Sequence, residues 1–507
     1  MVRFHPARRR ALAFILLAGL GGCDLGPDYK RPGAEIPSAW RAGRTTAAEA
    51  WPSGEWWRGF RSPELNALID EARARNFDIA AAIARIRQAD AEVRIAGAPL
   101  LPTLGGTAGA SYQRLGTGSF SASSVSNPER GGKPYFDLHQ YSLIGNASYE
   151  VDFWGHNAAA LESAKASAVF SRYDQAVVAL TVLTDVATTW FTALDLKDRL
   201  EIAKQNLADA EQTLAVIQGR LAAGTASALD VAQQAALVAG VRATIPNFAN
   251  QLEQEIIALG VLVGRPPEAV RVRPGTLVAL ARPPVYPGLP SQLLARRPDV
   301  AEVEAELVAA NANIKVARAA FFPTVPLTGS AGFENTAIAT LFGPGATILS
   351  GTAAITQPIF DGGTLRGQLE QARGRYDELL ADYRKAIVQA FTDVETALAA
   401  VRYAADQVAA QAQAVATARR AADIARAQLA VGTVDVTTVL TVETTLYTDL
   451  DLLAQARLAQ FLGLLSLYQA LGGGWTQPRG PIPEQFPGLR PGRIVGGISL
   501  PVGDTIR

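Results

Sequence analysis

Two long intervals without proline constrain the fold of this chain more than any other feature. No proline occurs between Pro134 and Pro246, or between Pro358 and Pro478. Inside the first interval, small and apolar residues recur at steps of three and four from Leu200 to Leu221, which is the spacing of a packed helix. We expect one helix over 157–222, about 100 Å long at about 1.5 Å per residue. Such a helix exceeds the needs of an ordinary globular core.

The chain also contains an internal repeat. Thr184-Asp185-Val186 recurs as Thr392-Asp393-Val394, and Gly224-Thr225 recurs as Gly432-Thr433, with the same separation in both cases. Each copy is expected to begin with a shorter helix (63–98 and 298–320) and to end with a glycine turn followed by a return helix. Pro246 lies in the first return helix, where it is expected to break or kink it. A repeat of this size indicates a duplicated domain.

Each repeat contains two segments that alternate between apolar and polar residues, as β-strands do. We expect strands at 103–112, 141–153, 325–334 and about 347–357, with a polar loop at 113–140. In the second segment, Leu143 and Ala147 share one face, and Asn146 and Ser148 share the other. Strands of about ten residues with one apolar face are typical of membrane barrels. A half-buried sheet in a soluble protein shows the same alternation.

Four strands per chain cannot close a barrel, and unpaired strand edges are not tolerated in lipid. Three copies together supply about twelve strands, which lies within the range of known barrels. No run of about 18 uncharged apolar residues follows the N-terminus, so the sequence predicts no membrane-spanning helix. A membrane-spanning form therefore has to be a barrel shared between chains.

The N-terminus has the features of a lipoprotein signal peptide. Arginines at positions 3 and 8–10 precede a short apolar segment, and Leu20-Gly21-Gly22-Cys23 follows in the manner of a lipobox. Cys23 is the single cysteine of 507 residues, so we expect it to be acylated; the alternative is an ordinary signal peptide with an incidental cysteine. Asp24 follows it, and aspartate at this position tends to retain enterobacterial lipoproteins in the inner membrane. The predicted organisation is a signal peptide (1–22), a lipid-anchored extended segment (23–62), two repeat domains (63–290 and 291–475) and an irregular tail (476–507).

Several short motifs resemble those of one family, the TolC-like outer-membrane efflux proteins of the NodT lipoprotein type. The resemblance covers about 23–475 and rests on motifs that are specific only in combination. These are Gly26-Pro27-Asp28-Tyr29-Lys30-Arg31-Pro32 after Cys23, Trp57 and Phe60 before Leu65 and Leu68, Asp152-Phe153-Trp154-Gly155, Arg296-Arg297-Pro298-Asp299-Val300, Phe322-Pro323, Phe360-Asp361-Gly362-Gly363 and Leu471-Gly472-Gly473-Gly474-Trp475.

The resemblance implies an α+β membrane protein, a TolC-like trimeric channel. Four strands per protomer would share a 12-stranded barrel, continued by a long periplasmic α-helical coiled-coil barrel. The implied function is the exit duct of a tripartite efflux pump in the outer membrane. The implied partners are two further copies, a periplasmic adaptor protein, an inner-membrane pump of the RND type and outer-membrane lipid. The outer-membrane component of a type I secretion system is an alternative.

Two groups of candidate site residues lie at the far ends of the long helices. In the family these tips contact the adaptor, which points to Leu221, Gly224, Thr225, Ser227, Leu429, Gly432 and Thr433. In the family an aspartate near the position of Asp435 forms a ring that constricts the closed pore, and carboxylate rings select cations. The alternative for Asp435 is a solvated charge at a helix N-terminus, and for the two glycines it is a helix C-cap.

Two other classes of protein fit the sequence less well. Equal numbers of acidic and basic residues (47 each) argue against nucleic-acid binding, and neither phosphate loops nor zinc motifs are present. The sequence predicts no enzyme, no cofactor and no metal site. A periplasmic coiled-coil adaptor or scaffold lipoprotein is a weaker alternative, because adaptors lack paired barrel strands in both halves. The sequence does not specify the cargo. Met1 is the sole methionine, which argues against a methionine-lined copper(I) path in this subunit.

Overall fold

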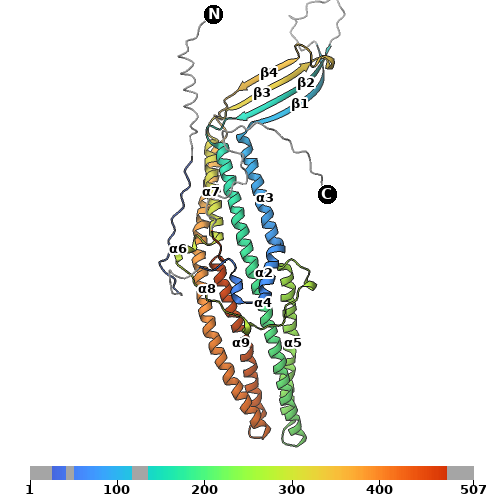
Figure 1. The fold of residues 1–507 in the computed structure, drawn as a ribbon, viewed down its shortest axis with the longest axis vertical. Helices are drawn as coiled ribbons and strands as arrows, with labels where there is room; N and C mark the ends of the chain where they lie inside the picture. The colour runs from blue at the N-terminus through green and yellow to red at the C-terminus, as the bar shows by residue number, and fades with distance from the viewer. Residues whose placement is uncertain (1–25, 42–50, 117–134, 477–507) are drawn as a thin grey trace, which may run out of the picture.

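The computed structural model describes residues 26–41, 51–116 and 135–476, which form one elongated body (Figure 1). A four-stranded sheet lies at one end and two helical hairpins reach the other, joined by α4 (His156–Ala222) and α8 (Thr364–Ala430). Each of these helices has 67 residues and is therefore about 100 Å long. The long helix predicted from the proline-free interval is confirmed.

The duplication is visible in the element lengths. The return helices α5 (Ala228–Leu262) and α9 (Val436–Ala470) have 35 residues each, and their starting residues have the same separation along the chain as those of α4 and α8. The shorter helices α3 (Phe77–Gly97) and α7 (Pro298–Ala319) lead from the middle of the body to the sheet. The limits of the two repeat domains, 63–290 and 291–475, stay predictions.

The strands β1 (Thr103–Gly116), β2 (Tyr135–Glu150), β3 (Pro326–Asn335) and β4 (Thr347–Ala353) form one antiparallel sheet in the order β1-β2-β3-β4. Leu143 pairs with Ala108 of β1 and with Phe333 of β3, so the apolar residues predicted for the three strands lie on one common face. On the opposite face, the Asn146 side chain donates to the Thr107 hydroxyl at 3.3 Å. The alternation read from the sequence is thus a real division between two faces.

The strand ends differ from the prediction. β1 and β2 extend into the predicted 113–140 loop, of which residues 117–134 lie outside the described residues. β2 stops at Glu150 rather than residue 153, because the Phe153 N–H donates to the Val151 carbonyl and Asp152 accepts from the Ala158 N–H. β4 stops at Ala353, although Thr356 still forms a bridge to Thr324.

The helix expected over 63–98 is two helices, α2 (Pro63–Arg75) and α3, so that prediction was wrong. Asn76 between them is extended, and its side-chain oxygen accepts from the N–H groups of Asp78 and Ile79. This is an asparagine N-cap, which begins a new helix. Its amide also donates to the Leu262 carbonyl at 2.9 Å, so the break is fixed by a contact with α5.

Pro246 does not break α5, so the predicted break was wrong, whereas the predicted alternative of a kink stays a prediction. The helix continues through it from Ala228 to Leu262. Proline removes one N–H donor and crowds the carbonyl four residues earlier. The neighbouring positions of the helix are largely exposed, so water can solvate the freed carbonyl, and the Thr244 hydroxyl donates to the Val241 carbonyl at 2.8 Å.

The aromatic core lies near the middle of the body, where the two repeats meet. The Trp56 and Tyr468 rings stack at 5.1 Å, and Phe60 contacts both Phe191 (5.1 Å) and Phe461 (6.1 Å). A second cluster packs Trp40 and Leu293 against α8. The remaining short elements, mostly around these cores, are η1 (Trp56–Phe60), η2 (Ala98–Leu100), η4 (Pro267–Ala269), η5 (Leu277–Ala279), α6 (Pro290–Leu293) and η6 (Ile338–Thr340).

Two helices are long and apolar enough to cross a membrane by length and composition alone. Windows of α4 and α9 reach mean hydropathies of 1.6 and 1.2, whereas the sequence predicted no spanning helix. About half of each window is buried inside the protein (50% and 44%). Both helices contribute to the aromatic core, so their apolar character is explained by packing.

Candidate gate, docking tips and anchor

Both glycine turns at the tips end their helices in the same way. Gly224 and Gly432 have left-handed backbones with φ of +75° and +81°. The Gly224 N–H donates to the Leu221 carbonyl, and the Thr225 N–H reaches back to Arg220. Gly432 and Thr433 repeat this pattern on α8. These are Schellman motifs, in which glycine avoids the steric penalty of the left-handed conformation, so the C-cap interpretation of both glycines is confirmed.

The two return helices start with different caps at equivalent positions. Ser227 caps α5 and forms a capping box with Asp230, whose carboxylate accepts from the Ser227 N–H at 2.7 Å. Asp435, at the equivalent position of the second repeat, caps α9 alone and accepts from the Thr438 N–H at 2.7 Å. Hydrogen bonding from Thr438 lowers the pKa of Asp435, so this exposed carboxylate carries its charge at neutral pH. Only the second tip therefore has a carboxylate at its N-cap.

The exposure of the tip residues changes the set of candidate adaptor contacts. Leu429 is buried with Ile217 and Val439 between the two hairpins, so its side chain is not accessible to a partner. The sequence interpretation was wrong for this residue. Two apolar residues that it missed, Leu229 and Val431, are 64% and 75% exposed. Their place beside the two glycine turns is the signal that could have identified them.

Arg220 joins the two tips and was also missed. It lies in the last turn of α4, and its Nη1 donates to the Leu429 carbonyl at the end of α8 at 2.6 Å. Its Nη2 donates to the Thr225 carbonyl of its own tip at 3.2 Å. A cation at two helix C-termini donates to carbonyls that have no partner within the helix and interacts favourably with the negative ends of both helix dipoles. Arg220 therefore holds one tip against the other.

A buried polar cluster lies about two turns above the tips. The fully buried Glu443 of α9 accepts from Thr213 of α4 at 2.8 Å and from Gln234 of α5 at 3.3 Å. Arg426 of α8 binds Glu443 at 2.7 Å and Asp209 at 3.3 Å. Four helices thus converge on one carboxylate. A sequence signal existed, since Glu443 interrupts the apolar spacing of Val439 and Leu446.

The N-terminal segment 26–41, here called the strap, lies along α7 (Figure 1). The Asn311 side chain donates to the Pro27 carbonyl at 3.0 Å, and Arg31 binds Glu304 with its Nε at 2.7 Å. Trp40 closes the strap by donating to the Gly288 carbonyl at 2.8 Å. Cys23 and Asp24 lie outside the described residues. The strap begins three residues after Cys23, beside the sheet-proximal end of α7.

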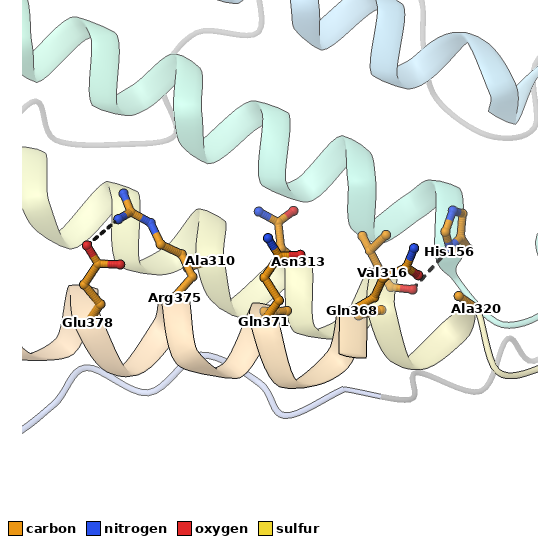
Figure 2. A pocket seen from close by; sticks show the side chains of 11 residues that line it. His156, Ala310, Asn313, Val316, Ala320, Gln368, Gln371, Arg375 and Glu378 are labelled. Atoms are coloured by element: carbon orange, nitrogen blue, oxygen red, sulfur yellow. Dashed lines mark hydrogen bonds and ion pairs between the residues drawn. The ribbon is translucent and has the colours of Figure 1, made fainter. Parts of the chain in front are cut away.

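A groove of about 620 Å³ runs between α7 and α8 (Figure 2). Its lining combines small side chains with the amides of Asn313, Gln368 and Gln371. At one end His156 Nδ1 lies 3.2 Å from the Val316 carbonyl, and at the other Arg375 binds Glu378 at 2.8 Å. The lining presents neither a nucleophile beside a base nor a convergent set of carboxylates. Among the described residues, no group of three or more potential metal ligands occurs.

Comparisons with known proteins agree on one family. The model of the family described as "Outer membrane efflux protein" matches residues 68–265 and 289–473. The chain is 40% identical over 470 residues to the pyoverdine export outer membrane protein OpmQ of Pseudomonas aeruginosa, covering 91% of this chain and 96% of OpmQ. It is 32% identical over 477 residues to the toluene efflux pump outer membrane protein TtgI of Pseudomonas putida (92% and 98% covered).

Two solved structures have the same fold. The outer-membrane channel OprN superposes with a TM-score of 0.81 at 25% identity, covering 89% of this chain and all (100%) of OprN. CusC superposes with a TM-score of 0.78 at 28% identity, with the same coverage of 89% and 100%. Three copies of a TolC-like channel share the barrel and the helical tunnel below it. The fold class and the trimeric architecture predicted from the sequence are confirmed.

The chain therefore belongs to the outer membrane efflux protein family. It is an outer-membrane efflux channel, and the family is one of transport proteins. The predicted function and the outer-membrane location are confirmed.

Proposed function

We propose that this channel is the exit duct of a tripartite pump, in which a periplasmic adaptor binds the tips and an inner-membrane pump of the RND type supplies the cargo. The observation that best supports this proposal is the exposure of two apolar side chains, Leu229 and Val431, at the far end of helices about 100 Å long. Burial of such exposed apolar surface against a partner is favourable. The tip surface is formed by Leu221, Gly224, Thr225, Ser227, Leu229, Val431, Gly432 and Thr433.

The proposed gate is a ring of three Asp435 carboxylates at the narrow periplasmic end. Support comes from the difference between the tips, since only the second carries a charged N-cap. A bond to its own helix keeps each carboxylate ionised. Three negative charges near one axis attract cations and repel one another, so the ring favours the passage of cations.

The proposed membrane anchor is the acylated Cys23. The strap supports it, because its first described residues lie beside the sheet-proximal end of α7, next to the strands. A chain of three residues spans at most about 11 Å. An acyl chain on Cys23 is therefore within reach of the membrane that holds the barrel.

The proposed cargo is pyoverdine or a compound of that class. Two relatives named for pyoverdine export are 40% and 38% identical to this chain, whereas those named for cation or toluene efflux are 30% and 32% identical. The test is expression in Pseudomonas aeruginosa lacking OpmQ, with pyoverdine measured in the medium. We expect the wild-type chain to restore export. Assembled trimers without restored export would rule out this cargo.

The same strain tests the docking surface. The double variant Leu229→Asp/Val431→Asp is expected to form trimers but to lose export, because charged groups cannot be buried against the adaptor. A matched control is Phe342→Asp, an exposed aromatic residue beyond the strands at the other end of the molecule. Export by the double variant at the wild-type level would contradict docking at these residues.

A further inference from the structure

Each protomer has two free edges. In the sheet, β1 and β4 are the outer strands. In the helical body α3 packs on α4, α4 on α7 and α7 on α8, so that α3 and α8 are the outer members of the row. α3 leads into β1 through η2, and α8 follows β4. One edge of the protomer therefore carries α3 and β1, and the other carries β4 and α8.

The strand directions fix how these edges meet in the closed barrel. All three pairings in the sheet are antiparallel, so β1 and β4 run in opposite directions. When β4 of one copy pairs with β1 of the next, their tunnel-side ends are adjacent. The first turn of α8 then lies beside the last turn of α3 in the next copy. Contact between these two helices is continuous with barrel closure.

Large apolar side chains are exposed at the membrane end of both edges. Ile359 and Phe360, just before α8, are 97% and 91% exposed. On the other edge, Ile95 at the end of α3 and Leu101 before β1 are 62% and 50% exposed. Neither pair lies within a strand, so the apolar face of the barrel does not account for them. Burial of such side chains against another protein surface is favourable.

Further from the barrel, the two edges carry a second pair of exposed apolar residues at similar heights. Phe77 lies twenty residues before the end of α3, about 30 Å below it. Val388 lies twenty-four residues after the start of α8, about 36 Å below that. Both side chains are exposed. The edges thus carry apolar groups at two similar heights.

Charged side chains of both edges lie between these heights, and α8 carries Arg366 and Arg373 there besides its carboxylates. Exposed Arg87 of α3 lies about 15 Å below the end of its helix. Exposed Glu370 and Asp377 of α8 lie about 9 and 20 Å below the start of theirs, on either side of that height. We expect Arg87 to pair with a carboxylate of the next copy, which favours this alignment over a shifted one.

We propose that adjacent copies of this chain are fastened at two heights along α3 and α8. Ile359 and Phe360 of one copy pack on Ile95 and Leu101 of the next at the base of the barrel. Val388 packs on Phe77 of the next copy, about six helical turns further down. The occupant of each apolar edge is a second copy of this chain. The trimer itself does not depend on the proposal, which concerns the residues that fasten it.

Cross-linking of engineered cysteine pairs tests the two contacts in the intact channel. The variants Phe77→Cys/Val388→Cys and Leu101→Cys/Phe360→Cys, treated with a short bifunctional maleimide in membranes, are expected to give covalent dimers and trimers on denaturing gels. The mismatched pair Phe77→Cys/Phe360→Cys joins positions at the two different heights and is expected to give none. Equal cross-linking of matched and mismatched pairs, or its absence in assembled matched trimers, would overturn the proposal.

Charge insertion separates a contact between copies from burial in lipid. Phe360→Asp is expected to lose most of the heat-resistant trimer while the monomer stays folded by circular dichroism. If Phe360 instead enters the membrane surface, Phe360→Asp keeps the trimer, and the Leu101→Cys/Phe360→Cys pair does not cross-link. That combination would contradict the upper contact.

Discussion

Asp195 of α4 is a buried carboxylate whose partners do not fully satisfy it. Its side chain is 1% exposed, and its Oδ1 has no hydrogen-bond partner among the described residues. Its Oδ2 lies 3.8 Å from Arg199, whose guanidinium binds Asp451 more closely at 2.6 Å. Burial raises the pKa of Asp195 to about 6, and Asp198 and Asp451 add to this effect while Arg199 opposes it. Two carboxylates therefore share one cation.

Because the pKa of Asp195 is raised in the folded state, protonation of this carboxyl group at mildly acidic pH is predicted to stabilise the folded protein. Above pH 6 the carboxylate is charged in both states, and a pKa of about 6 against a usual 3.8 corresponds to a folding penalty of roughly 3 kcal/mol. As pH falls from 7 towards 4 the folded state takes up the proton and the penalty disappears. Asp195→Asn is therefore expected to raise the melting temperature at pH 7.5 relative to wild type. That difference should shrink towards pH 4.5, and a pH-independent difference would contradict the interpretation.

Asp435 predicts a change in pore properties. Asp435→Ala removes the proposed ring and is expected to raise single-channel conductance and weaken cation preference in a planar bilayer. Asp435→Asn retains an N-cap oxygen without the charge, so it separates the electrostatic role from helix capping. Ser227→Ala, at the equivalent uncharged cap of the first tip, is the matched control and is expected to leave selectivity unchanged. Unaltered selectivity in both Asp435 variants would assign the residue to capping alone.

At the scale of elements, the two faces of β2 predict opposite tolerance to charge. Ala147 and Leu143 belong to the apolar face of the barrel, and an arginine at the midplane of such a face costs about 2–4 kcal/mol per copy. Ala147→Arg is therefore expected to prevent accumulation of heat-resistant trimer. Ser148→Arg, one residue further on the polar face, is the control and is expected to assemble. Equal outcomes for the two variants would reject the strand faces.

The carboxylate of Glu443 predicts local loosening of the hairpins. Glu443→Ala breaks the buried ion pair with Arg426, which typically costs about 3–5 kcal/mol, and leaves Gln234 with the Ala210 carbonyl as its remaining partner. Amide hydrogen exchange is expected to accelerate in α8 and α9 below Ala404, while the sheet keeps its protection. Glu201→Ala, at an exposed carboxylate of α4, serves as control. Unchanged exchange in both hairpins would show that the cluster does not hold them together.

The elements divide into those that local sequence determines and those that distant contacts determine. Glycine turns and strand alternation are local, so the two hairpins and the four strands were predictable. The break at Asn76 depends on the carbonyl of Leu262, far away in the sequence, and the role of Glu443 depends on three other helices. Leu429 and Val431 are both apolar and lie two residues apart. Leu429 is buried and Val431 is exposed only because of the way the two hairpins pack together. Local patterns hold no information about such contacts.

At the scale of the whole molecule, the anchor and the barrel are predicted to be independent. Cys23→Ser is expected to abolish labelling with a radioactive fatty acid but to leave trimer formation intact, because strand pairing closes the barrel without lipid. Trp40→Ala is the complementary change, since it weakens the strap but leaves the cysteine in place. Label retained in Cys23→Ser would exclude Cys23 as the acylated residue. Loss of trimer in that variant would mean that the anchor assists assembly.

The strap runs antiparallel to α7, and this direction has a mechanical consequence. Asp28 lies near Lys315 and Arg31 binds Glu304, so the strap descends as α7 ascends. A pull on the N-terminus along the long axis therefore acts parallel to the strap and loads its contacts together in shear, down to Trp40 in its core pocket. A peeling pull would break the same contacts one at a time. A pull on the N-terminus is in this way carried to the middle of the channel, away from the strands.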